Sequence, residues 1–239
     1  MISIITPWLD ASELRSVYER SCTWNKTISY NGDEIDVSTL ADPQWVEVIV
    51  IDNGSQAHHA NAIKAMVNRL NGRYIRNEKN QRFAAANNQG LAVATGDIVI
   101  FMNNDVECQP GWLARVERDV KPGGLYGPVK GSKVVGGRQL AYIEGHCIAA
   151  TRDTWEQLGG WDETLPGMYW EDNELCFRAM RMGIKLIETA WPIYHYGNYT
   201  SGQTPGAYDH SAANQAELAR RVLESERRDS NLAKVINER

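Results

Sequence analysis

Hydrophobic residues in the first hundred positions gather in short runs that alternate with segments of helical pattern. Runs of strand length occupy Ile2–Thr6, residues 45–52, residues 73–77 and the apolar part of residues 96–107. Apolar residues at helical spacing occupy the intervals, from about Ser12 to Trp24, at Ala57–Leu70 and at Arg82–Ala94. Strands that alternate with helices in this way predict a parallel sheet with helical crossovers.

Two regions interrupt this pattern. The polar stretch Thr27–Gln44 contains Asn-Gly and Asp-Pro steps that mark turns, so it is predicted to be a surface insertion. After Gly111 the pattern loosens, and the glycine-rich segment Gly127–Gly137 is predicted to be a flexible loop. A helix is predicted over residues 172–183 and a strand over residues 184–189.

The last segment, from about Ser211 to Arg239, is predicted to be a charged helix. Its interrupted apolar stripe consists of Leu218, Val222, Leu232 and Ile236. Such a stripe suits docking on the domain, pairing with a second copy of the chain as a homodimer, or contact at a membrane surface. Docking on the domain is the simplest of the three explanations, because it needs no partner outside the chain.

Two of the predicted strands end in polar residues. The second strand ends at Asp52, and the strand "IVIFM" runs into Asn103, Asn104 and Asp105. Because the carboxyl ends of parallel strands share one edge of a sheet, these residues are expected to border a common cleft. The alternative is that Asp52 and Asp105 only cap the turns that follow, and two such strand ends together favour the cleft.

The composition narrows the class of protein. The chain has 239 residues, of which 43% are hydrophobic and 23% charged, and no window has the apolar length of a membrane span. We expect one large domain plus a tail, and, since no basic leader precedes the first strand, a cytoplasmic location. The net charge of −5 argues against a nucleic-acid partner. Four widely spaced cysteines predict free thiols: Cys22, Cys108, Cys147 and Cys176.

Six segments occur in an order that resembles a known family. They are "SIITPWLD", "IDNGS", "NEKNQRFAAANNQGLAVATGD", the triplet "NND", the pair "GHCIAATRDTWEQLGGWDE" and "YWEDNELCFRAMRMG", and "IYHYGNYTSG". Together they resemble the glycosyltransferases of family 2, which have the GT-A fold, over most of residues 1–200. The triplet resembles that family's DxD metal motif.

The resemblance implies an α/β fold with a single Rossmann-like, mixed but mostly parallel sheet flanked by helices and a C-terminal helical tail. It places a GT-A domain at residues 1–210, with a nucleotide-binding half at 1–107 and an acceptor-binding half at 108–210. Residues 211–239 form the tail.

The implied reaction moves a sugar from a nucleotide-diphosphate sugar to an acceptor hydroxyl, with inversion by direct displacement. A divalent cation, Mn²⁺ or Mg²⁺, would neutralise the departing diphosphate as a Lewis acid. Asp105 carries the full charge of the triplet, and His195 resembles the family's second metal ligand. A lone histidine is more often structural, so the assignment of His195 depends on its place in the motif.

A carboxylate is needed to take the proton of the acceptor hydroxyl. Asp172 in "WEDNEL" is the expected base, and Glu171 is the alternative, which could instead orient the acceptor. Without the resemblance, both would be explained as carboxylates at the start of a helix, where the helix dipole favours them.

The remaining implied residues bind donor and acceptor. Arg82 could reach the diphosphate or project into solvent, and each tryptophan could equally belong to the core. The donor set is Pro7, Trp8, Asp52, Asn80, Arg82, Asn87, Asn103 and Asn104, and the acceptor set is Trp170 and Trp161. The donor would be a UDP-, GDP- or dTDP-sugar, and the acceptor a glycan, a lipid-linked molecule or a protein.

Two other functions stay open: a sugar nucleotidyltransferase, and a nucleotide-sugar or glycan binding module on an inactive scaffold.

Overall fold

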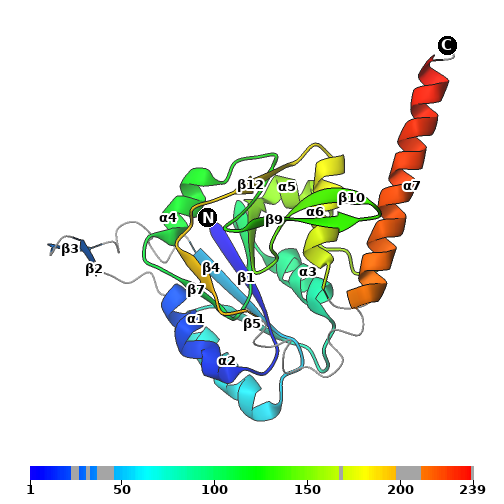
Figure 1. The fold of residues 1–239 in the computed structure, drawn as a ribbon. Coiled ribbons are helices and arrows are strands. Elements are labelled where there is room, and N and C mark those ends of the chain that lie inside the picture. The colour runs from blue at the N-terminus through cyan, green and yellow to red at the C-terminus, as the bar shows by residue number, and fades with distance from the viewer. Residues whose placement is uncertain (23–26, 31–32, 37–45, 167–168, 198–210, 238–239) are drawn as a thin grey trace.

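The fold is built around one twisted sheet, seen in the computed structural model of the chain (Figure 1). The structure describes residues 1–22, 27–30, 33–36, 46–166, 169–197 and 211–237. Within them, seven strands form the sheet in the order β12-β8-β11-β6-β1-β4-β5. Their bounds are β1 Ile2–Trp8, β4 Val46–Asp52, β5 Arg73–Arg76, β6 Ile98–Met102, β8 Gly124–Gly127, β11 Cys147–Thr151 and β12 Lys185–Glu188.

Alternating side chains along the strands build a core on each face of the sheet. Ile4 and Ile100 point into one core, where they meet Met66. Their neighbours Ile5 and Phe101 point into the other, where they meet Trp155. Because these strands are buried on both faces, they are continuous hydrophobic runs in the sequence, as the parallel-sheet prediction requires.

Helices cover both faces. The first core packs against α1 Arg15–Cys22, the short helix η1 Ser12–Leu14 before it, α2 Ala57–Arg69 and α4 Trp112–Asp119. The second packs against α3 Phe83–Val93, α5 Arg152–Leu158 and α6 Glu171–Arg181. The predicted alternation of strands and helices through the first half is therefore confirmed, with ends that differ by a few residues.

One strand runs against the others. β1 pairs in parallel with β4 and β6, whereas β11 is antiparallel to both β6 and β8. The register places Cys147 opposite Met102, so the start of β11 lies beside the end of β6. The loop that leads into β11 therefore reaches the same edge of the sheet as the loops that leave β1, β4 and β6.

The prediction of a flexible loop at Gly127–Gly137 is wrong. This segment contains the end of β8 and β9 Lys130–Val135, which pairs with β10 Arg138–Ile143 as an antiparallel hairpin. Gly136 and Gly137 form its turn at φ 57° and 80°, a conformation that glycine adopts without strain. The high glycine content thus marks a tight turn between two strands.

Smaller pairs of strands complete the structure. β7 Val106–Cys108 pairs with β13 Ile193–His195. The predicted insertion contains the antiparallel pair β2 Thr27–Tyr30 and β3 Asp33–Asp36. Its residues 31, 32 and 37–44 lie outside the described residues, as do 23 and 24 of the first predicted helix. The four cysteines are free and buried, as predicted.

The tail forms the long helix α7 Ser211–Asn237. Its first half docks on the hairpin, where Leu218 and Val222 pack against Val135, and its far end extends beyond the body of the fold (Figure 1). Ion pairs of Arg181 with Asp229 and of Arg138 with Glu226 hold the middle of the helix. Docking, the least demanding of the three explanations, therefore accounts for the part of the stripe at Leu218 and Val222.

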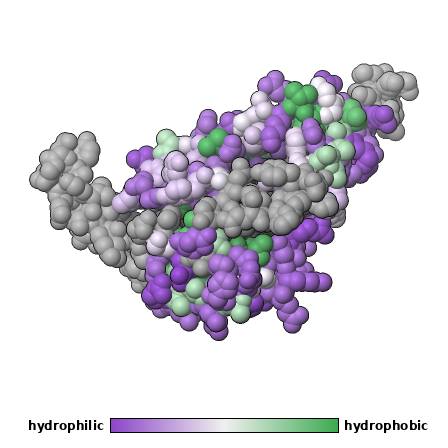
Figure 2. Space-filling model, turned by 60° about the horizontal axis from the view of Figure 1, so that its bottom comes forward, coloured by the Kyte–Doolittle hydropathy of each residue, from purple (hydrophilic) through white to green (hydrophobic). Residues whose placement is uncertain are grey.

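No helix in the described part of the chain has the length and apolar character to cross a bilayer. On the face drawn in Figure 2, hydrophobic residues form small separate areas among hydrophilic ones.

Candidate active site

A cavity of about 610 Å³ opens at the carboxyl edge of the sheet. Its walls come from the ends of β1 and β6, the loop before α3, the loop before β11, the hairpin, the start of α6 and the end of β13. The residues of these walls that bear on function are Pro7, Trp8, Asn53, Asn80, Arg82, Asn103, Asn104, Asp105, Lys133, Tyr142, Glu144, His146, Trp170, Glu171, Asp172 and His195.

Asp105 and His195 meet on the floor of this cavity. The pairing of β13 with β7 sets His195 opposite Val106, the residue after Asp105. Nε2 of His195 consequently lies 3.2 Å from Oδ1 of Asp105. Beside them, the buried Nδ2 of Asn104 finds no hydrogen-bond partner among the described residues, so this amide can donate to a ligand.

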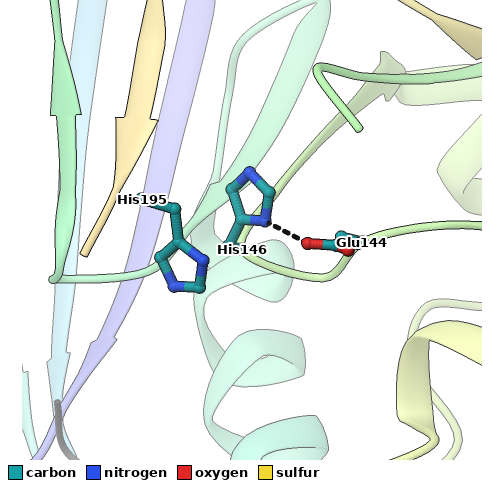
Figure 3. Close-up of side chains that lie close together, drawn as sticks. All are labelled: Glu144, His146 and His195. Carbon is teal, nitrogen blue, oxygen red and sulfur yellow. Dashed lines mark ion pairs between the residues drawn. The ribbon is translucent and has the colours of Figure 1, made fainter. Parts of the chain in front are cut away.

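Two further polar side chains, those of Glu144 and His146, come from the loop before β11. The backbone amide of Asn103 donates to the carbonyl of His146 at 2.9 Å, which ties this loop to the end of β6. The ring of His146 stacks on that of His195, with centroids 4.3 Å apart and planes 13° from parallel. Its Nδ1 lies 3.4 Å from Oε2 of Glu144, and the carboxylate points toward this ring (Figure 3).

Glu144, His146 and His195 could together hold a metal ion. One ligand atom from each lies within 4.8 Å of the other two. Burial, and after it the neighbouring His195, lower the pKa of His146 to about 4 against the opposing effect of Asp105. His146 is therefore neutral near pH 7, the form in which imidazole binds metals.

The two carboxylates at the start of α6 differ in their surroundings. Burial raises the pKa of Glu171 to about 7. Asp172 is less enclosed, and its Oδ2 accepts a hydrogen bond from the amide of Gly145 at 3.1 Å. Burial raises its pKa as well, and that hydrogen bond opposes the rise. Tyr169 and Trp170, just before them, both have positive φ, of 67° and 74°.

Arg82 lines the opposite wall with a strained backbone. Its φ of 71° and ψ of 170° fall in a region that is essentially restricted to glycine. Its carbonyl accepts from Nδ2 of Asn53, and its Nη1 donates to the carbonyl of Leu165. Arg82 thus reaches the residues before α6 while its backbone borders the cavity.

The hairpin supplies a cation and an aromatic ring. Nζ of Lys133 lies 5.0 Å from the ring centre of Tyr142 and 4.5 Å from that of Trp170. The indole nitrogen of Trp170 donates to the hydroxyl of Ser211 at the start of α7. This wall therefore joins the hairpin, α6 and the tail.

The structure brings most of the expected site residues to this cavity. Pro7, Asn80, Arg82, Asn103, Asn104, Asp105, Trp170, Glu171, Asp172 and His195 all line it. Trp8 also lines it but is only 1% exposed, and its ring packs edge-on against Tyr18 in the core.

Three expected residues lie outside this lining. Asp52 is fully buried and accepts hydrogen bonds from Tyr74 and Arg76. Asn87 is buried within α3 and donates to the carbonyl of Phe83. Trp161 is 2% exposed and packs in the second core. These contacts give each of them a structural explanation, and their binding roles stay predictions.

Several lining residues were not predicted from the sequence: Asn53, Lys133, Tyr142, Glu144 and His146. Asn53 directly follows Asp52 in "IDNGS", so its position at a strand end was a usable signal. Glu144 and His146 flank Gly145 in "EGH", directly before the strand "CIAAT". A glutamate and a histidine two residues apart are a weak metal signal, and only the reversed direction of β11 brings them to the cavity.

Comparison with known proteins finds similarity to one sequence family over part of the chain. The family model described as "Glycosyl transferase family 2" matches residues 37–139. The chain is also 28% identical over 131 residues to the pre-mycofactocin glycosyltransferase of Mycobacterium tuberculosis, an alignment that covers 43% of this chain and 27% of that protein. The expected resemblance is confirmed.

Solved structures identify the fold. The mannosyltransferase PcManGT from Pyrobaculum calidifontis, in complex with GDP-Man and Mn²⁺, matches with a TM-score of 0.60 at 18% identity, over 79% of this chain and 54% of that one. GalNAc-T7, with UDP, GalNAc and Mn²⁺, matches with a TM-score of 0.64 at 16% identity, over 90% and 47%. The predicted GT-A fold is confirmed. The chain spans between 11% and 27% of the length of the curated relatives it matches.

Proposed function

Since the chain resembles glycosyltransferase family 2 over residues 37–139 and has the GT-A fold, we propose that it transfers a sugar from a nucleotide-diphosphate sugar to an acceptor hydroxyl in a metal-dependent reaction. The proximity of Asp105 and His195 carries this proposal. The two residues are ninety positions apart in the sequence, yet their side chains lie 3.2 Å from each other in a cavity at the carboxyl edge of the sheet. This is the edge at which open α/β sheets bind ligands.

The residues present fit a divalent cation. Nε2 of His195 is buried and finds no hydrogen-bond partner among the described residues, and a carboxylate oxygen of Asp105 is its nearest charged neighbour. We propose that Asp105 and His195 hold Mn²⁺ or Mg²⁺. When bound, the cation would neutralise the negative charge that develops on the departing diphosphate.

The polar residues around this pair would hold the donor. The buried amide of Asn104 can donate to a sugar or phosphate oxygen, and Asn103 follows the end of the same strand. Pro7 and Trp8 would border the nucleobase. Arg82 lines the wall and is exposed, so it could approach the diphosphate, although its Nη1 already bonds Leu165. The nucleotide would be uridine, guanosine or deoxythymidine diphosphate, and the sugar a hexose or deoxyhexose.

Asp172 is the proposed general base, with Glu171 as the alternative. In the displacement, the acceptor oxygen bonds to the anomeric carbon while the bond from that carbon to the diphosphate oxygen breaks, and the acceptor proton passes to the carboxylate. Backbone amides of Gly145 and Asn173 donate to Oδ2 and Oδ1 of Asp172, and the carboxylate lines the cavity. Attack opposite the leaving group gives inversion. Trp170 would contact the acceptor.

Turnover of nucleotide sugars tests this proposal. The purified chain is incubated with UDP-, GDP- and dTDP-sugars and Mn²⁺, and release of free nucleotide diphosphate is measured with and without added acceptors. We expect at least one donor to be hydrolysed slowly in the presence of metal and not in EDTA. Stabilisation by donors without any turnover would favour a binding module, and release of pyrophosphate from sugar phosphate and nucleoside triphosphate would favour a nucleotidyltransferase.

A further inference from the structure

We infer that Glu144 and His146 are ligands of the same cation as His195, so that the chain holds a transition-metal ion before any nucleotide binds. The inference rests on the proposed function only for the purpose of the ion. It adds two residues to the metal site and predicts which metals the site prefers and in what order metal and donor arrive.

The geometry is close to that of a coordination site. The nearest ligand atoms of Glu144, His146 and His195 lie within 4.8 Å of one another. Ligand atoms around one zinc ion lie about 3.4 Å apart, since each is about 2.0–2.2 Å from the metal. The three side chains come from the loop before β11 and the end of β13, and in Figure 3 the ring of His146 lies between the ring of His195 and the carboxylate of Glu144. Rotations about side-chain bonds would have to bring the ligand atoms to that spacing.

Two buried ring nitrogens that make no hydrogen bond within the described part of the chain are available to a metal ion. Nδ1 of His146 and Nε2 of His195 are both inaccessible to solvent and have no hydrogen-bond partner among the described residues. Buried polar atoms are nearly always paired, and an unpaired one calls for an explanation such as an ion. One ion bound by Glu144 and by both nitrogens would satisfy them, once one ring rotates out of the stack so that the two lone pairs converge.

The donor set predicts the type of metal. Two imidazoles and a carboxylate suit Mn²⁺, Co²⁺ and Zn²⁺, whereas Mg²⁺ prefers oxygen ligands and keeps several waters. Asp105, whose Oδ1 lies 3.2 Å from His195, adds a further oxygen. Four protein ligands are enough to hold such an ion without a diphosphate, and a six-coordinate ion would keep two positions open for one.

Glu144 and His146 could instead be neighbours that bind no metal, and metal titration separates the two explanations. The full chain is dialysed against EDTA, freed of chelator, and titrated with Co²⁺ in the absence of nucleotide, by visible absorption and calorimetry. We expect one equivalent to bind with the absorption bands of a cobalt ion that has nitrogen ligands. An equal concentration of Mg²⁺ should not displace it.

Variants assign the ligands. His146→Ala should weaken Co²⁺ binding by more than the roughly 10–100-fold that loss of an outer-shell partner costs, and should change the absorption bands. Glu144→Gln should weaken binding too. The matched control is His58→Ala, because His58 is exposed on α2 and does not line the cavity. Its affinity and spectrum should equal those of the wild type.

Spectra of the wild-type chain keep the inference testable if His146→Ala unfolds. In long-range ¹H–¹⁵N spectra of the histidine rings, addition of Zn²⁺ should shift two sets of ring nitrogens strongly. A response from one histidine alone, unchanged Co²⁺ affinity in His146→Ala, or no binding without nucleotide would each overturn the inference. Metal binding without turnover of any donor would instead leave the inference standing and contradict the proposed function.

Discussion

Nη1 of Arg82 donates a hydrogen bond to the carbonyl oxygen of Leu165 at 2.9 Å, and the backbone that positions this side chain is strained. The φ and ψ of Arg82, 71° and 170°, are tolerated by glycine and cost other residues about 1–3 kcal/mol. Arg82 therefore occupies a position at the cavity wall whose backbone conformation favours glycine.

Backbone strain at this position should reverse the usual order of alanine and glycine. Arg82→Ala and Arg82→Gly both remove the guanidinium, so their difference isolates the backbone. We expect the glycine variant to be more stable by about 1 kcal/mol or more in urea unfolding. At Lys64, exposed in the interior of α2, the same pair should show alanine more stable by about 1 kcal/mol. The same order at both positions would contradict the strain.

Loss of the Asp105 carboxylate should abolish turnover and leave the fold intact. Asp105→Asn keeps the size of the side chain and removes its charge beside His195. We expect metal-dependent nucleotide release to fall by at least roughly 10²-fold, because stabilisation of the leaving diphosphate is lost. Glu107→Gln is the matched control, since Glu107 is two residues further on, bonded to Tyr196 and outside the cavity lining. Normal turnover in Asp105→Asn would remove Asp105 from the metal site.

The proposed base should affect transfer but not donor binding. Asp172→Asn preserves an oxygen that can accept from Gly145 and removes the proton acceptor. Transfer should slow by roughly 10²–10⁴-fold while donor affinity stays within a few-fold. Glu171→Gln is measured in parallel. If only that variant lost transfer, the two roles would be exchanged, and if Asp172→Asn lost donor binding, Asp172 would belong to the nucleotide site.

Glu171 should make the fold less stable as the pH rises. Its pKa is about 7 in the folded chain because the group is buried, and about 4.3 in an unfolded chain. Between these values the folded state binds more protons, so the stability that this group contributes is complete below about pH 4 and is lost as the pH rises to 7.

Glu171→Gln tests this dependence. Gln cannot ionise, so the variant should gain on the order of 1–3 kcal/mol relative to wild type between pH 5 and pH 8. Urea unfolding of both proteins at the two pH values gives the difference directly. A constant difference would mean that Glu171 titrates near its ordinary pKa. Asp172 and Arg82 are the charged neighbours of this group, and Gln leaves both unchanged.

Docking of α7 on the domain should depend on Leu218 and not on Leu223, a second leucine in the same helix. Leu218 is fully buried against Val135, whereas Leu223 is 41% exposed. Leu218→Ala should cost about 2–5 kcal/mol if α7 unfolds with the domain. If α7 detaches alone, amide hydrogen exchange in residues 211–225 should accelerate instead. Leu223→Ala should change either measurement little, and equal effects of the two substitutions would contradict docking.

The sheet was predictable because its residues carry their own pattern. Ile4 and Ile5 lie in a mostly apolar run of strand length, and this run continues directly into Pro7 and Trp8, which line the cavity. The hairpin at Gly136 was not predictable in the same way, since glycine favours a loop and a tight turn alike.

The site was predictable where a motif is continuous in sequence. Asp105 follows its strand directly, and the histidine motif identified His195. The position of Glu144 and His146 depends on the direction of β11, which is a tertiary pairing with β6 and leaves no local mark on the sequence. For Asp52 the position at a strand end was predicted correctly, but the direction of its side chain was not. Its carboxylate is buried and accepts hydrogen bonds from Tyr74 and Arg76.

The order of strands in the sheet has a consequence for synthesis of the chain. β5, β4, β1 and β6 are neighbours in the sheet, and all four come from residues 2–102, so they can pair while the ribosome is still translating the rest. The cavity, in contrast, needs the loop before β11, the start of α6 and, last, His195. A cation held by His195 therefore cannot assist the early steps. It can rescue a destabilised variant only after residue 195 has left the ribosome, by mass action on the finished fold.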